Sequence, residues 1–256
     1  MYFLVLRGWR GHDDVDALAR TLAESLGKNL PEARTRLLAG GPLVVASFLE
    51  LEPATARADA LRSRGIADLL VIRGSEIETD AGRCFARHFE LGDRGLSVAD
   101  RQRILEIPYG EIELLLRGTR LEAQTTRDKP STREFSLART VMSGGLMITR
   151  PVAAVRGSRA EERTGFLHLY AGERPVVALR EVDLLFQSLG AELRLSRQAN
   201  FQYLVAELRR RAPAAIYDER LVQRGGQVQL LGPGLSPDRH LDVALSVLAR
   251  ILRGNA

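Results

Sequence analysis

In the first third of the chain, short apolar runs alternate with stretches in which apolar residues recur every three or four positions. Tyr2–Leu6 is a continuous apolar run with the length of a buried strand. Apolar residues then follow at helical spacing from Val15 to Leu26, and Gly27 ends that stretch. From residue 2 to residue 72 the pattern predicts strand, helix, helix, strand, helix and strand, in that order.

Proline and glycine mark the remaining boundaries of this first unit. Pro31 lies where the second helix should begin, a position at which its missing N–H costs nothing. Gly40 follows that helix, and Pro53 opens the third one. Gly65 is placed to stop the third helix, and residues 68–72 supply the closing strand.

Beyond the first unit, apolar residues alternate with polar ones, which is typical of strands. A glycine-containing turn at residues 92–95 separates two alternating segments and predicts a hairpin. Two further strands are expected within residues 104–118, and others at residues 166–170 and 176–186. Most of the predicted sheet therefore lies between residues 83 and 186.

The last third predicts two helices separated by a turn. Ser196 is suited to cap the first of them. Gly225 and Gly226 stand between two short apolar segments and predict a final hairpin. Ser236 and Pro237 begin the last helix. Its apolar stripe consists of Leu241, Ala244, Leu245, Leu248, Ile251 and Leu252.

The composition is that of a globular protein, with 256 residues of which 45% are hydrophobic and 27% charged. No apolar run approaches the roughly 20 residues that cross a bilayer. The opening apolar run precedes its nearest arginines, whereas a secretory signal places positive charge first, so a strand is favoured. Cys84 is the single cysteine, which excludes an intrachain disulfide. We therefore predict a cytoplasmic protein.

The net charge of +5 is concentrated between residues 124 and 165, which hold eight basic and four acidic side chains. A loop over residues 125–164 would be unusually long, and long loops are functional or disordered. One hypothesis is that its basic side chains bind nucleic acid or acidic lipid. The alternatives are a solvated loop and a contact with a protein. The candidate anion-binding residues are Arg127, Lys129, Arg133, Arg139, Arg150, Arg156, Arg159 and Arg163.

Six positions in the first unit form a pattern that is shared with a known family. They are Leu30, Glu32, Ala33, Gly40, Pro42 and Gly65. With these residues at this spacing, residues 1–76 resemble the C-terminal domain of the bacterial ribosomal stalk protein. The resemblance implies a small βααβαβ domain that docks other proteins and has no catalytic chemistry of its own.

The surface around the second expected helix differs from that family. The family's factor-binding surface is rich in lysine, whereas only Arg34 and Arg36 are basic nearby in this chain. Aliphatic residues stand there instead, and we predict that they bind a partner protein. The alternatives are that they form the unit's own core or pack against the second domain. These residues are Leu37, Leu38, Leu43 and Val44.

The histidines and the cysteine do not predict a catalytic or metal site. His12, His88, His168 and His240 stand apart and lack the spacing of helical metal ligands. Cys84 and His88 would lie about 13 Å apart along one strand, too far for nucleophile activation. The glycine clusters match no phosphate-binding or dinucleotide-binding loop. We therefore expect no catalytic residue, no cofactor and no metal.

Together these patterns predict an α+β protein with two domains, residues 1–76 and 77–256. The second is expected to be a mostly antiparallel β domain with two helices and a long basic loop at 125–164, similar in outline to pleckstrin-homology-like barrels. The predicted function is that of a non-enzymatic adaptor or regulatory protein that binds another protein. The alternatives are an anion-binding protein and an enzyme whose site no motif reveals.

Overall fold

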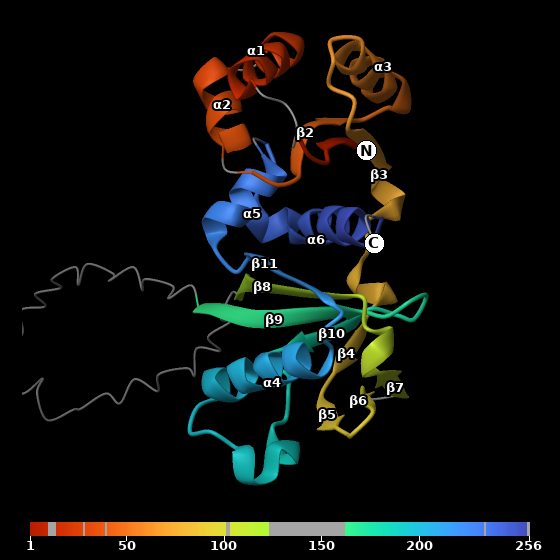
Figure 1. Ribbon diagram of the computed structural model, residues 1–256, viewed down its shortest axis with the longest axis vertical. Coiled ribbons are helices and arrows are strands. Elements are labelled where there is room, and N and C mark those ends of the chain that lie inside the picture. Colours follow the sequence, from red (N-terminus) through yellow and green to blue (C-terminus); the bar gives the residue numbers. More distant parts are fainter. Residues whose placement is uncertain are drawn as a thin grey trace, which may run out of the picture. The chain divides into compact units, whose positions relative to one another are not determined.

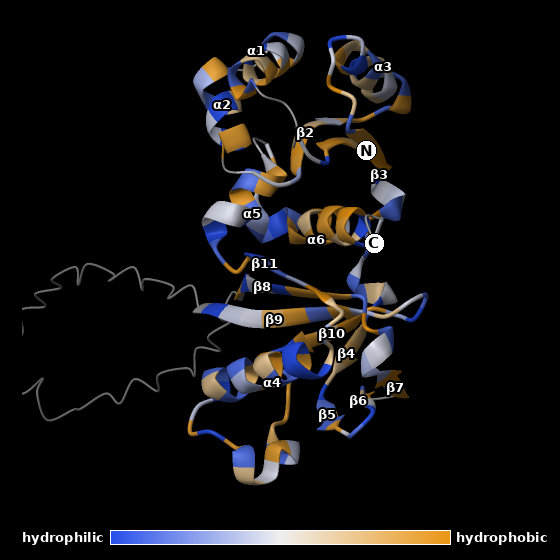
Figure 2. Cartoon of the chain, in the orientation of Figure 1, coloured by the Kyte–Doolittle hydropathy of each residue, from blue (hydrophilic) through white to orange (hydrophobic). Residues whose placement is uncertain are grey.

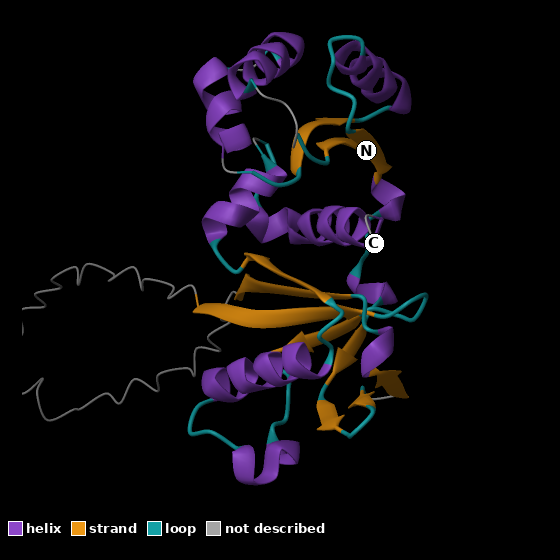
Figure 3. Cartoon of the chain, viewed as in Figure 1, coloured by secondary structure: helices purple, strands orange, loops and turns teal. Residues whose placement is uncertain are grey.

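The computed structural model describes residues 1–9, 14–27, 29–38, 40–100, 103–122, 162–232 and 234–254. The chain divides into two compact units, and the larger comprises Met1–Arg120 and Thr164–Ala256 (Figure 1). The smaller unit, Leu121–Arg163, lies mostly outside the described residues. Helices and antiparallel sheets are both present, which confirms the α+β class (Figure 3).

The N-terminal part contains the six elements that the sequence predicts, in the predicted order. They are β1 (Tyr2–Leu6), α1 (Val15–Leu26), α2 (Leu30–Leu38), β2 (Leu43–Phe48), α3 (Leu51–Arg62) and β3 (Leu69–Arg73). Strand β1 is central and runs antiparallel to both β2 and β3. The Asp14 carboxylate accepts a hydrogen bond from the Ala17 N–H over 2.9 Å, and Gly27 ends α1 at φ 61°. The element order is confirmed, while the resemblance to the stalk domain stays a prediction.

A five-stranded mixed sheet forms the centre of the remainder, in the order β11-β8-β9-β10-β4. Strand β9 runs antiparallel to β10, whereas β10 with β4 and β11 with β8 are parallel pairs. The strand expected at residues 176–186 is shorter than predicted and ends at Arg180. The five strands are β4 (Cys84–Ala86), β8 (Leu114–Glu122), β9 (Glu162–Tyr170), β10 (Val177–Arg180) and β11 (Ile216–Leu221).

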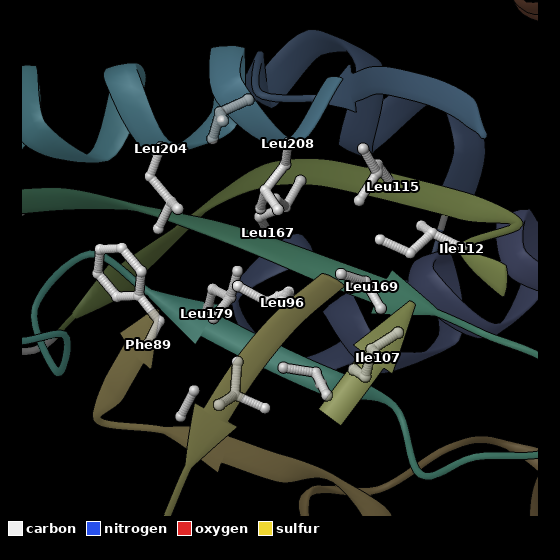
Figure 4. Close-up of a cluster of buried hydrophobic side chains, with 14 of the residues drawn as sticks. Phe89, Leu96, Ile107, Ile112, Leu115, Leu167, Leu169, Leu179, Leu204 and Leu208 are labelled. Carbon is white, nitrogen blue, oxygen red and sulfur yellow. The ribbon is translucent and has the colours of Figure 1, made fainter. Parts of the chain in front are cut away.

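A three-stranded antiparallel sheet and helix α4 (Arg197–Arg211) share a core with one face of the five-stranded sheet. The small sheet consists of β5 (His88–Leu91), β6 (Gly95–Ala99) and β7 (Ile104–Pro108), so the hairpin predicted around residues 92–95 is confirmed. Figure 4 shows how side chains from these elements meet in one apolar cluster. They include Phe89, Leu96, Ile107, Leu167, Leu169, Leu179, Leu204 and Leu208.

Helix α6 (Pro237–Gly254) occupies a second core between the five-stranded sheet and the β1 sheet (Figure 1). Phe3 on β1 and Leu114 on β8 belong to the same buried cluster as Leu248 of α6. The middle of α6 is accordingly apolar on more than one side (Figure 2). The two sheets share no strand. Residues 1–76 and 77–256 are nevertheless not the two separate domains that the sequence predicts, because α6 packs against both sheets.

The hairpin predicted at Gly225 and Gly226 is wrong, because both residues lie in helix α5 (Arg224–Leu231). A Cβ atom at Gly226 would lie 2.2 Å from the backbone oxygen of Arg220, so glycine permits α5 to pack closely against the end of β11. The described part of residues 77–256 therefore has three α-helices, one more than predicted. The likeness to pleckstrin-homology-like barrels stays a prediction.

Candidate functional site

Helix α6 carries one line of polar residues on an otherwise apolar middle section. Asp242, Ser246, Arg250 and Arg253 follow at intervals of four, four and three residues, which places them along one side of the helix. The neighbouring positions are mostly buried apolar residues that fill the core described above. We call these four residues the α6 polar stripe.

The segment between β3 and β4 runs along the α6 polar stripe. It contains two 3-10 turns, η1 (Gly74–Glu76) and η2 (Asp80–Gly82). The Glu76 carboxylate forms an ion pair with Arg250. The backbone N–H of Glu78 donates a hydrogen bond to Ser246 Oγ over 2.9 Å. These contacts fix the position of the segment on the helix.

Arg83 is a buried cation at the other end of the stripe, with a side chain that is only 2% exposed. Its guanidinium donates to the Asp242 carboxylate over 2.6 Å and to the Asp80 carboxylate over 2.9 Å. Burial by itself would lower the pKa of Arg83, but the hydrogen bond and charge of Asp242, then those of Asp80, outweigh it and raise that pKa. The Nε atom has no hydrogen-bond partner among the described residues. Arg83 is therefore a permanent buried charge that depends on both carboxylates.

Strand β9 supplies Tyr170 to the same network. Tyr170 and Phe166 belong to the α6 side of the sheet, whereas Leu167 and Leu169 pack on the α4 side. The Tyr170 hydroxyl donates a hydrogen bond to the Glu78 carboxylate over 3.0 Å. Burial, followed by the charge of Glu78, raises the pKa of Tyr170 well above its usual value. The phenol thus stays protonated and remains a donor.

His168, two residues before Tyr170 on β9, is a buried neutral imidazole. Its pKa lies well below the usual value, because burial, and then the positive charges of Arg83 and Arg180, disfavour the imidazolium form. The ring lies 5.1 Å from the Phe166 ring, centroid to centroid. Its Nδ1 atom has no hydrogen-bond partner among the described residues. His168 therefore adds a polar but uncharged group near Arg83 and Arg180.

An open cleft of about 630 Å³ lies beside the C-terminal half of the α6 polar stripe. Its polar lining includes three carboxylates, from Glu76, Glu78 and Glu113. Arg250 and Arg253 supply two guanidinium groups of opposite charge to the same lining. The described lining residues thus form a mixed-charge surface with one carboxylate in excess.

Arg253 connects the rim of the cleft to the strands behind it. Its guanidinium pairs with the Glu113 carboxylate over 2.8 Å and donates to the Gly172 carbonyl over 2.6 Å. It also lies 5.7 Å from the centroid of the Tyr170 ring, within the range of a cation–π contact. These three contacts hold the arginine against the wall of the cleft.

Two groups of this network have pKa values that are shifted away from neutrality. The hydrogen bond and charge of Arg250 lower the pKa of Glu76, which keeps that carboxylate ionised. Tyr170 is held protonated, as described, and is buried behind Glu78. General acid–base catalysis at neutral pH uses groups whose pKa lies near 7. Neither of these two groups is tuned in that direction.

The arginines that the sequence singled out are placed as follows. Arg127, Lys129, Arg133, Arg139, Arg150, Arg156 and Arg159 lie outside the described residues. Arg163 is described and is exposed, close to the start of β9. The predicted anion-binding set therefore stays a prediction.

The four aliphatic residues predicted to bind a partner divide into three environments. Leu37 and Leu43 are buried in the core of the N-terminal part. Val44 is buried in the second core, with α5 and α6. Leu38 alone is accessible, with 64% of its surface exposed. The prediction is corrected for the other three side chains, because the fold already uses them.

Cys84 and His88 do not share a strand, contrary to expectation. Cys84 lies in β4 of the five-stranded sheet, and His88 lies in β5 of the three-stranded sheet. The Cys84 thiol is buried, and its Sγ atom lies 3.5 Å from the Asp100 carboxylate. Burial raises the pKa of this thiol most, and the Asp100 carboxylate raises it further.

His240 lies at the start of α6, where its Nδ1 atom accepts a hydrogen bond from the Ser236 N–H over 3.0 Å.

The sequence contained a signal for the α6 polar stripe that the apolar pattern obscured. Polar residues at positions 242, 246, 250 and 253 keep helical spacing within a helix that is otherwise apolar. Any buried member of such a line requires a hydrogen-bond partner inside the fold. The partners, at residues 76–83 and 113, could not be identified, because they are distant in sequence.

Within the described ranges, no group of three or more histidine, cysteine, aspartate or glutamate side chains is arranged to hold a metal ion. None of the described helices combines the length and the apolar character needed to span a bilayer. Comparisons with protein-family models, with curated proteins and with solved structures found no match to this chain.

Proposed function

We propose that the protein is a non-enzymatic adaptor or regulatory protein, and that the cleft beside α6 is where it contacts a partner protein. The observation that supports this is the pairing of charges in the cleft. Glu76 with Arg250 and Glu113 with Arg253 form ion pairs on an open surface. Exposed pairs of this kind add little to stability, about 0–1 kcal/mol each. Arranged around a cleft, they provide an electrostatic pattern that a partner can match.

Reversing one ion pair tests this proposal in the intact protein. The double variant Glu76→Arg with Arg250→Glu keeps an intramolecular pair but inverts its polarity, so the fold should be retained. The matched control reverses Glu111 and Arg174, a pair of similar exposure that does not line the cleft. Each protein is used to capture partners from its native host, with quantitative mass spectrometry as the readout.

The expected result is a partner that is enriched by the wild type and by the control variant and lost with the cleft variant. Equal recovery by all three proteins would contradict the cleft as the contact surface. Absence of any protein enriched above the blank matrix would contradict the adaptor function itself.

The enzymatic alternative gains one observation from the structure. Titratable groups converge on the cleft, and such pockets are the usual location of active sites. The donor that could assist a reaction, Tyr170, is however buried and engaged by Glu78. Binding is therefore the better supported proposal. Anion binding by the arginines of residues 125–164 remains an alternative, and it should weaken steeply with added salt.

A further inference from the structure

Among the residues that the structure describes, the cleft beside α6 contains one carboxylate, that of Glu78, without a close cationic partner of its own. Glu76 is paired with Arg250, and Glu113 with Arg253. Among the described residues, Glu78 has its ion pair with Arg83, at 4.0 Å. Arg83 is held more closely by Asp242, at 2.6 Å, and by Asp80, at 2.9 Å. Negative charge at Glu78 is thus only partly compensated.

Glu78 is accessible from the cleft, with a side chain that is 30% exposed. Its carboxylate already accepts the Tyr170 hydroxyl at 3.0 Å, which fixes the position of one oxygen. A carboxylate accepts up to about four hydrogen bonds, so it has capacity for a donor from the cleft. A ligand cation could therefore bind the oriented Glu78 carboxylate without displacing an arginine from it.

Apolar side chains also belong to the lining of the cleft. Ile216 of β11 is partly exposed there, whereas Ile72 of β3 and Ala249 of α6 have only 1% and 2% of their surfaces exposed. An exposed apolar side chain favours contact with methylene groups, at roughly 25 cal/mol per Å² of apolar surface removed from water. Ile216 and the Glu78 acceptor together match an aliphatic chain that ends in a cation.

We propose that this cleft binds an ammonium or guanidinium group on a short aliphatic chain, with the cation at Glu78 and the methylenes against the partly exposed Ile216. This inference rests on the proposed partner-binding function and specifies its chemistry. A lysine or arginine side chain of a partner protein has this chemistry, and so does a free alkyl amine. An anionic ligand fits less well, because both arginines of the cleft are already paired.

The test is titration of the purified full-length protein with n-butylguanidinium, followed by calorimetry and by NMR chemical shifts. Its uncharged analogue n-butylurea serves as the ligand control. A ligand of this size should bind with a Kd on the order of 1 mM. Replacing Glu78 by Gln should weaken binding by about fivefold or more, because the charge is lost while the acceptor for Tyr170 is kept.

A second variant changes the affinity in the opposite direction. Arg250→Gln removes the ion-pair partner of Glu76, so n-butylguanidinium should bind about two- to fivefold more tightly. Glu111→Gln, outside the cleft, should leave the affinity unchanged. A general loss of folding cannot produce one decrease and one increase, so the pair of variants separates charge recognition from instability.

An acetylated and amidated Gly-Arg-Gly peptide separates the two sources of the cation. Tighter binding of the peptide than of n-butylguanidinium assigns the site to a partner chain, and the reverse order assigns it to a free small molecule. Undetectable binding of n-butylguanidinium at about 10 mM, ten times the expected Kd, would overturn the inference. Equal binding of n-butylurea, or an affinity unaffected by Glu78→Gln, would also overturn it. Partner capture that depends on the cleft would then still support the proposed function.

Discussion

Replacing Asp242 by Asn tests whether the buried cation at residue 83 depends on helix α6. The Arg83 side chain is 2% exposed and lies 2.6 Å from the Asp242 carboxylate. Removing one partner of a buried ion pair costs about 3–5 kcal/mol. Asp242 is itself 38% exposed and Asp80 remains at 2.9 Å, so part of the charge stays compensated. We therefore expect the free energy of unfolding to fall by about 2–3 kcal/mol.

The assay is urea denaturation followed by far-UV circular dichroism at neutral pH. Asp59→Asn is the matched control, because it removes an exposed carboxylate that pairs with Arg62 over 2.8 Å. An exposed pair is worth about 0–1 kcal/mol, so this variant should unfold close to the wild-type midpoint. The slope of the free energy against urea concentration should be the same for all variants if the unfolded states are equivalent.

A third variant, Arg83→Met with Asp242→Leu, removes both charges together. Replacement of a buried pair by apolar residues is often neutral, and Asp80 keeps its ion pair with Arg180 at 3.0 Å, so much of the stability should return. The reasoning would be refuted if Asp242→Asn and Asp59→Asn cost the same. It would also be refuted if the double replacement were as unstable as the single one, since the cost would then not come from an uncompensated charge.

Two further predictions concern the interior of the larger unit. The pKa of His168 is lower in the folded than in the unfolded state. The contribution of His168 to the free energy of unfolding is therefore fully present above about pH 6.5. It is lost as the pH falls toward the pKa of the folded state, at up to about 1.4 kcal/mol per pH unit. In His168→Leu, the urea midpoint should depend less on pH between about pH 5 and 6.5 than it does in the wild type. The same pH dependence of the midpoint in both proteins would contradict this. Gly226→Ala should lower the melting temperature through a loss of about 1–3 kcal/mol, because its Cβ would lie 2.2 Å from the Arg220 carbonyl oxygen. Gly225→Ala has open space and should be neutral or slightly stabilising, so equal melting temperatures for the two variants would exclude the steric argument.

The sequence predicts the N-terminal elements well because their signals are local. Asp14, Gly27 and Pro31 each act within a few residues of the helix end that they mark. Helix α5 was missed for the opposite reason. Gly225 and Gly226 carry a strong local turn signal, and Gly226 is instead required by close packing against Arg220. Tertiary packing there overrides local preference.

The cleft could not be predicted, because its groups come from four separate parts of the chain. Glu78 and Ser246 are 168 positions apart, and Glu113 and Arg253 are 140 apart. No spacing rule relates residues at such separations. Leu37 and Leu43 could not be assigned from the sequence for another reason. A cluster of aliphatic residues is equally consistent with a buried core and with a partner-binding surface. Only the folded structure shows that these two side chains belong to the core.

The place of α6 in the chain has a consequence for biosynthesis. Every strand of the two sheets that pack against α6 leaves the ribosome before this helix does. Until residues 237–254 emerge, Phe3 and Leu114 lack the cover that α6 provides, and the growing chain exposes apolar surface on both sheets to chaperones and proteases. A chain truncated before residue 237 would keep that surface exposed, and cellular proteases should degrade it.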